Sequence, residues 1–148
     1  MILIGLPGAG KTTFYRERFA ATHVHVSKDL WPNATGREAR QRRLIDEALA
    51  AGSSVVVDNT NPAAADRAAL IALARARGAR VVGYFFDVTT RAAVARNAGR
   101  SGSDKVPNVA IFTVAKRLQP PQLAEGFDEL FRVEIGEDRA MRVSPVSA

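Results

Sequence analysis

The stretch Gly5-Leu-Pro-Gly-Ala-Gly-Lys-Thr12 decides the fold of this 148-residue chain. It fits the pattern G-x-x-x-x-G-K-[ST] and lies between a short apolar run, Ile2–Gly5, and a helix expected over Lys11–Ala21. Because Gly8 and Gly10 have no side chains, successive backbone N–H groups can face the oxygens of a bound phosphate chain. The helix that follows adds the positive end of its dipole. The stretch therefore predicts a loop that holds nucleotide phosphates.

Each side chain of this loop has an expected task. The Lys11 ammonium would reach the β and γ phosphates, the Thr12 hydroxyl would ligate Mg²⁺, and the Thr13 hydroxyl would bind the α-phosphate. Asp58 closes a strand of valines, where phosphate-loop enzymes keep the acid that orients the magnesium shell. The residues expected to bind the nucleotide are Pro7, Gly8, Ala9, Gly10, Lys11, Thr12 and Thr13, and those expected to bind the metal are Thr12 and Asp58.

Apolar, β-branched runs alternate with helical patterns along the rest of the chain. Strands are expected over Ile2–Gly5, Val24–Ser27, Ser54–Asp58, Arg80–Phe86 and Phe131–Ile135. Further helices are expected from a capping box at Thr35-Gly-Arg-Glu38 to about Ala51, from an Asn61 cap to Gly78, and over Thr90–Asn97 and Val109–Leu118. Strands separated by helices imply parallel βαβ units, so the sequence predicts a three-layer α/β domain. Ligands of such sheets bind beyond the carboxyl ends of the strands.

Composition excludes several classes of protein. The chain has no cysteine, which rules out disulfides and thiol nucleophiles, and no uncharged apolar stretch approaches the roughly 20 residues of a membrane span. From these features we expect a cytoplasmic protein. The formal net charge of +6 is compatible with a polyanionic partner, although an arginine-rich composition alone would also produce it.

The phosphate loop alone does not decide among kinases, GTPases and mechanical ATPases. A GTPase would need a base-specificity motif of the N-K-x-D type, and the sequence has none. A small kinase needs a phosphate loop, an acid beside the acceptor hydroxyl and a cationic lid over the γ-phosphate. Candidates for all three are present, which favours a kinase.

Four blocks in order resemble the polynucleotide 5′-kinase domain of bifunctional polynucleotide kinase–phosphatases. They are Gly5–Phe14, His23-Val-His-Val-Ser-Lys-Asp29, Asp58-Asn-Thr-Asn-Pro62 and Leu123-Ala-Glu-Gly-Phe127, and the resemblance extends to about Ile135. It implies a P-loop kinase fold with five parallel strands in the order 2-3-1-4-5. It also implies transfer of the ATP γ-phosphate, with Mg²⁺, to a 5′-hydroxyl of DNA or RNA.

The resemblance also implies roles for individual residues. Asp29 matches the general base of the family, and a carboxylate just beyond the second strand suits that task. Arg96-Asn97-Ala-Gly-Arg100 matches the lid pattern R-N-x-x-R, whose arginines would clamp the β and γ phosphates. The same arginines would also suit a helix carboxyl end. The expected catalytic residues are Asp29, Lys11, Arg96 and Arg100.

The chain departs from the family pattern at one position. Some members carry an arginine three residues after the general base to hold a phosphate of the acceptor, and Pro32 stands there in this sequence. Cations just downstream could replace it, but an exposed helix face explains them better. Those cations are Arg37, Arg40, Arg42 and Arg43. Trp31 is expected to pack rather than to stack on a base, and His23 and His25 are interpreted as polar residues of an edge strand.

We expect one kinase domain over residues 1–136, with a lid at about 96–107 and a frayed polar tail over 137–148. The expected partner is a 5′-hydroxyl polynucleotide end, with no membrane involved. A phosphatase or ligase would have to be a separate chain. Two alternatives stay open: a kinase for a small hydroxylated molecule such as a sugar, nucleoside or antibiotic, and a non-catalytic ATP-binding module.

Overall fold

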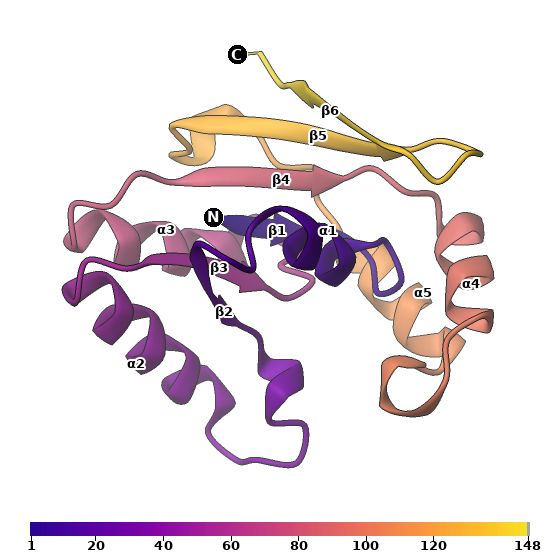
Figure 1. The fold of residues 1–148 in the computed structure, drawn as a ribbon, viewed down its shortest axis with the longest axis horizontal. Coiled ribbons are helices and arrows are strands. Elements are labelled where there is room, and N and C mark those ends of the chain that lie inside the picture. Colours follow the sequence, from indigo (N-terminus) through magenta and orange to yellow (C-terminus); the bar gives the residue numbers. More distant parts are fainter. Residues whose placement is uncertain (148) are drawn as a thin grey trace.

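One six-stranded sheet forms the middle layer of the protein (Figure 1). The computed structural model describes residues 1–147. The strands are β1 (Ile2–Ile4), β2 (His23–Val26), β3 (Ser54–Asp58), β4 (Val82–Phe86), β5 (Glu129–Ile135) and β6 (Met141–Pro145). Their order is β2-β3-β1-β4-β5-β6, and the first five pair in parallel. The predicted fold class and the predicted order of the five parallel strands are confirmed.

Helices cover both faces of this sheet. The α-helices are α1 (Lys11–Arg18), α2 (Arg37–Ala50), α3 (Ala64–Ala76), α4 (Thr90–Ala98) and α5 (Asn108–Arg117). Short 3₁₀ turns form η1 (Lys28–Leu30), η2 (Gly102–Asp104) and η3 (Leu123–Glu125). The first helix ends at Arg18, three residues before the predicted end at Ala21. None of the helices in residues 1–147 combines the length and the apolar character that crossing a bilayer requires.

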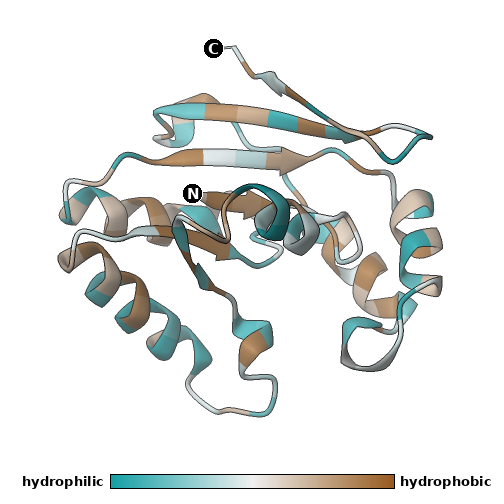
Figure 2. Cartoon of the chain, in the orientation of Figure 1, coloured by the Kyte–Doolittle hydropathy of each residue, from teal (hydrophilic) through white to brown (hydrophobic). Residues whose placement is uncertain are grey.

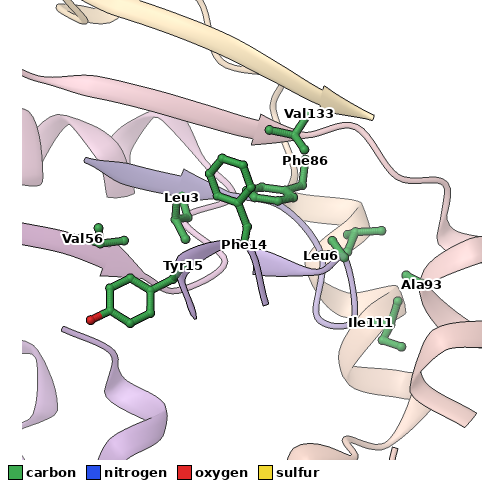
Figure 3. Close-up of a cluster of buried hydrophobic side chains, with 10 residues drawn as sticks. Leu3, Leu6, Phe14, Tyr15, Val56, Phe86, Ala93, Ile111 and Val133 are labelled. Atoms are coloured by element: carbon green, nitrogen blue, oxygen red, sulfur yellow. The ribbon is translucent and has the colours of Figure 1, made fainter. Parts of the chain in front are cut away.

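Successive side chains along each strand point to opposite faces of the sheet, so the core has two sides. Leu3, Val56 and Phe86 face α1, where Phe14 is fully buried among them (Figure 3). The alternate residues of β1 and β3 face α2 and α3 instead. Because both faces are covered, β1 and β3 are apolar for most of their length (Figure 2). The buried β1 holds the loop that follows it in the centre of the sheet.

The frayed tail predicted over 137–148 was wrong for residues 141–145, which form β6. This strand pairs antiparallel with β5, and Met141 and Val143 pack against the core beside α1. A turn at 136–140 reverses the chain between β5 and β6, and Arg139 in this turn has a left-handed φ of 62°. Two inward apolar residues between polar ones are a weak signal, and a short edge strand therefore escaped prediction.

Two predicted helix caps were also wrong. The α2 helix begins after Gly36, at a φ of 66°, without a side-chain cap, and Glu38 forms an ion pair with Lys28 rather than closing a capping box. The Asn61 side chain does not cap α3; its amide donates to the Leu3 carbonyl oxygen at 2.8 Å. Both side chains found tertiary partners, which local sequence patterns cannot reveal.

A buried arginine joins two segments that carry motif blocks, Asp58–Pro62 and Leu123–Phe127. Arg67 is fully buried, and its guanidinium binds the Glu125 carboxylate and the backbone oxygens of Asn61 and Pro62. Phe127 is buried in the core next to this network. The Leu123–Phe127 block therefore maintains the fold and positions the segment after β3.

Candidate active site

The phosphate loop connects β1 to α1. It packs against α4 at Gly8 and against β6 at Gly10. Gly8 and Gly10 adopt left-handed φ angles of 79° and 94°. A Cβ atom on Gly8 would lie 2.9 Å from the Ala93 carbonyl oxygen, so the loop contacts α4 directly. A Cβ on Gly10 would meet Met141 of β6 at 3.2 Å and the Arg96 guanidinium at 3.4 Å. These contacts explain the glycines and bring Arg96 to the loop.

Lys11 is the buried cation of the loop. Its ammonium donates to the carbonyl oxygens of Gly5 at 3.0 Å and Leu6 at 2.7 Å. Burial lowers the pKa of Lys11 to about 8, although the charges of Asp58 and Asp29 act in the opposite direction. The positive charge of Arg100 lowers that pKa further. The structure therefore gathers three of the predicted site residues within electrostatic reach of Lys11.

Thr12 and Asp58 lie together as the sequence predicts for a metal-binding pair. The Thr12 hydroxyl donates to Asp58 Oδ2 at 2.8 Å, and Asp58 is only 3% exposed. Burial acts to raise the pKa of Asp58, but hydrogen bonds from His25 and Thr12 and the charge of Lys11 outweigh it, so this pKa is lowered. The carboxylate is thus ionised at neutral pH. Thr13 is exposed in the first turn of α1.

The oxygen donors of Thr12 and Asp58 fit a hard cation such as Mg²⁺. Magnesium sites on phosphate-loop proteins use one or two protein oxygens together with waters and substrate phosphates. Of the residues that the structure describes, no three histidine, cysteine, aspartate or glutamate side chains lie together as a metal-binding group. A cation here would therefore depend on oxygens of the nucleotide.

Sequence reasoning missed His25, which it interpreted as an edge-strand residue. The His25 ring nitrogen Nε2 lies 2.8 Å from Asp58 Oδ2, and the ring stacks on Tyr15 with centroids 4.2 Å apart. On the parallel pair of β2 and β3, His25 lies opposite Val56, which shares a face of β3 with Asp58. The contact between His25 and Asp58 therefore follows from the register of β2 against β3, which is defined only in the folded sheet.

Asp29 lies in η1, directly beyond the carboxyl end of β2. Its side chain is exposed, and its backbone N–H donates to Ser27 Oγ at 3.2 Å. Hydrogen bonds to the neighbouring segments hold the η1 turn in place. The Lys28 N–H donates to Asn59 Oδ1 at 2.9 Å, and the Asn59 amide donates to Gln41 at 2.6 Å. These hydrogen bonds join the turn that carries Asp29 to the segment after β3 and to α2.

Arg96, beside the phosphate loop, lies within electrostatic reach of two further arginines. Burial lowers the pKa of Arg96, and the positive charges of Arg100 and Arg139 lower it further. Arg139, in the turn before β6, was not predicted, because the strand that positions it was not predicted. Three neighbouring guanidinium groups form a positive region that can bind polyphosphate.

Asn97 explains the middle of the predicted lid pattern. It is 1% exposed, its amide donates to the Val106 carbonyl oxygen at 2.6 Å, and its side-chain oxygen accepts from the Val106 N–H at 3.0 Å. The same amide lies 3.3 Å from Asn108 Oδ1. Asn97 therefore closes the segment between α4 and α5 into a loop and holds its two ends together.

Trp31 packs, as predicted, against the core beneath α2, and Arg40 covers its ring with the guanidinium 4.5 Å from the centroid. Asp87, beyond β4, pairs with Arg132 at 3.5 Å. Its carboxylate is therefore neutralised by a residue of β5.

Comparison with known proteins places these features in a family. A profile of the AAA domain family matches residues 1–121. A protein of Acanthamoeba polyphaga mimivirus named "Putative bifunctional polynucleotide phosphatase/kinase" is 28% identical over 152 residues, covering 98% of this chain and 35% of the relative. This chain thus spans about a third of the length of that relative.

Solved structures agree with this placement. A chain in the structure of the Pnkp1/Rnl/Hen1 RNA repair complex aligns with a TM-score of 0.65 and 25% identity over 80% of this chain and 43% of that chain. A gluconokinase from Sinorhizobium meliloti 1021 aligns with a TM-score of 0.66 and 19% identity over 92% of this chain and 82% of that chain. The resemblance to polynucleotide kinase domains is confirmed, and the fold is shared with a sugar kinase. The chain therefore belongs to the AAA domain family of P-loop proteins, as a kinase-like phosphotransferase domain that resembles the kinase part of polynucleotide phosphatase/kinases.

Proposed function

We propose that this domain transfers the γ-phosphate of ATP to the 5′-hydroxyl end of DNA or RNA. One observation carries the proposal: Asp29 is an exposed carboxylate within electrostatic reach of the buried Lys11, just beyond the carboxyl end of β2, which β3 separates from β1 and the phosphate loop. A base in this position is open to a large acceptor. The 28% identity with the mimivirus protein supports a polynucleotide as that acceptor.

The positions of the charged groups support the following proposed reaction. Lys11 and the loop N–H groups would hold the β and γ phosphates, and Asp29 would take the proton of the attacking hydroxyl. A bond forms between the 5′ oxygen and the γ phosphorus, while the bond from this phosphorus to the β–γ bridging oxygen breaks and leaves ADP. Arg96 and Arg100 would neutralise the charge on the leaving phosphate. Mg²⁺, held by Thr12 and Asp58 with the nucleotide, would supply further positive charge at the phosphates.

The test is a labelling reaction with γ-labelled ATP and matched DNA and RNA oligonucleotides that carry 5′-hydroxyl ends. We expect label on the 5′ end and a rate that falls as salt increases, since phosphate contacts release counterions. Asp29→Asn should lower the rate by about 10²-fold or more while ATP affinity stays nearly unchanged. Glu17→Gln, an exposed acid on α1, is the matched control and should behave as wild type.

A second candidate is phosphorylation of a small sugar or sugar acid, which the alignment with 82% of the gluconokinase favours. Label on gluconate or other small alcohols, with none on any oligonucleotide, would replace the first proposal with the second. ATP binding without transfer to any acceptor would contradict both. If the polynucleotide is the acceptor, a phosphatase and a ligase activity would complete the repair of the strand end.

A further inference from the structure

A cavity of about 340 Å³ lies between α2 and α3. This volume falls in the range of pockets that bind small organic ligands. Lys28 and Asn59 line it, and each is adjacent in sequence to a carboxylate of the site, Asp29 or Asp58. The backbone of Lys28 also binds the Asn59 side chain at 2.9 Å. The cavity is therefore lined by the chain neighbours of these two carboxylates and by no residue of the phosphate loop.

The two walls of the cavity differ in chemistry. The α3 wall is mostly apolar, formed by Ala69, Leu70 and Leu73. The opposite wall is polar, with Gln41 and Arg42 from α2 and the Thr60 hydroxyl from the segment after β3. An apolar wall opposite hydrogen-bonding and cationic groups suits a nucleotide unit, whose base and sugar have apolar faces and whose phosphate is an anion.

Arg42 is the cation of this cavity that remains available to an anion. Lys28 pairs with Glu38, and Arg117 pairs with Asp66 at 3.1 Å. Within residues 1–147, Arg42 has no ion pair, and its side chain is exposed. A phosphate placed beside it would meet an unneutralised guanidinium.

The other three arginines at the start of α2 have partners. Arg37 donates to the Lys28 carbonyl oxygen at 3.4 Å, Arg40 covers Trp31, and Arg43 lies 3.9 Å from Glu47. Arg42 alone among them lines the cavity. The helix face that sequence analysis interpreted as a solvated surface therefore contains one residue directed to a binding site.

We propose that this cavity binds the second nucleotide of the acceptor strand, with the phosphate between the first two nucleotides on Arg42 and the second base against α3. The inference rests on the proposed function. It assigns to Arg42 the anchoring of an acceptor phosphate in a chain that has Pro32 three residues after Asp29. Acceptor affinity would then increase in two steps, first with a 3′-phosphate and then with a second nucleoside.

The test compares thymidine, thymidine 3′-phosphate and the dinucleotide d(TpT) as acceptors at saturating ATP. For wild type we expect KM to fall by about tenfold when the 3′-phosphate is added, as one charge-assisted contact would give, and to fall again for the dinucleotide. Arg42→Ala should raise KM about tenfold for the two phosphate-bearing acceptors, with kcat retained and no change for thymidine. Arg43→Ala, the adjacent arginine outside the cavity, is the control and should match wild type.

A second variant tests the apolar wall. Ala69 is exposed on α3 and lines the cavity, so Ala69→Phe should fill it without disturbing the core. This variant should raise KM for the dinucleotide and leave KM for thymidine 3′-phosphate unchanged. Ala68→Phe, exposed on the same helix outside the cavity, is the matched control.

The outcomes separate this inference from the proposed function. If wild type labels oligonucleotides but Arg42→Ala and Ala69→Phe match their controls, the cavity assignment is wrong and the polynucleotide kinase assignment stands. An equal rise of KM for all three acceptors in Arg42→Ala would also overturn the cavity assignment, because it would indicate a general disturbance. If wild type labels no 5′-hydroxyl oligonucleotide, both proposals fail.

Discussion

The Arg67 guanidinium binds both oxygens of the Glu125 carboxylate, with Nε to Oε1 at 2.8 Å and Nη2 to Oε2 at 3.0 Å. The remaining N–H groups of Arg67 donate to the backbone oxygens of Asn61, Pro62 and Gln119, so all five donors of a fully buried side chain have partners. The pair joins the segment after β3 to the segment before β5. The position of the segment after β3 therefore depends on a contact between residues 58 apart in sequence.

Removal of Glu125 should destabilise the protein markedly. In Glu125→Ala the buried Arg67 charge loses its partner, and we expect the free energy of unfolding to fall by about 2 to 4 kcal/mol, toward the low end for buried pairs because Glu125 remains 17% exposed. Urea denaturation measures the difference. Glu47→Ala removes an exposed partner of Arg43 and should cost less than about 1 kcal/mol. Equal losses in the two variants would contradict the structural role of Arg67.

The same pair predicts how stability depends on pH. Burial acts to raise the pKa of Glu125, but hydrogen bonds from Arg67 and the Gln122 N–H outweigh it, so this pKa lies below its ordinary value of 4.5. A depressed carboxyl pKa gives stability that is fully present above the unfolded value and is lost as pH falls through the folded value. The stability gap between wild type and Glu125→Gln should therefore be constant near neutral pH and shrink in acid below about pH 4.5. A gap that widens in acid would have the wrong sign.

ATP binding should weaken in mild alkali because Lys11 loses its proton. With a pKa of about 8 in the free protein, Lys11 is largely protonated at pH 7 and largely neutral at pH 9. We expect ATP affinity, measured by calorimetry without added metal, to fall about tenfold between these pH values. Lys11→Gln should bind weakly and without this dependence. A wild-type affinity that is the same at both pH values would contradict the buried, titrating lysine.

Gly8 should tolerate a methyl group less well than another left-handed glycine. Gly36 has a φ of 66° and nothing within 4 Å of an added Cβ, so Gly36→Ala should cost about 1 to 2 kcal/mol from backbone strain alone. In Gly8→Ala the Cβ also meets the Ala93 carbonyl oxygen at 2.9 Å. We expect a larger loss of stability, and ATP affinity reduced by roughly tenfold or more as the loop moves from α4. Thermal unfolding and nucleotide titration of the two variants provide the comparison.

The features of this protein that depend on local sequence patterns could be predicted from the sequence. The loop at Gly5–Thr12, the alternation of strands and helices, and the neighbouring positions of Thr12 and Asp58 all follow from motif and periodicity. Residues whose partners lie far along the chain were not predictable in this way. Asn61 binds the Leu3 backbone and His25 binds Asp58, and in each case the partner is defined only by the pairing of strands.

The C-terminal hairpin was missed for a different reason. Edge strands carry few apolar residues, and β6 contributes only Met141 and Val143 to the core. Its turn nevertheless brings Arg139 toward Arg96, and its Met141 lies next to Gly10. A weakly encoded element thus completes one side of the phosphate site.

The central position of β1 separates the two substrates onto different stretches of chain. Most groups around the polyphosphate come from the start of the chain, α4 and the last hairpin, with Asp58 at the end of β3 as the exception, whereas the cavity proposed for the acceptor is built mainly from α2, the segment after β3 and α3. Evolution can therefore vary the middle third of such a protein outside Asp58, and with it the alcohol that receives phosphate, while the remaining groups that hold ATP stay unchanged. Grafting residues 28–73 from this chain into a sugar-specific relative would exploit the same modularity.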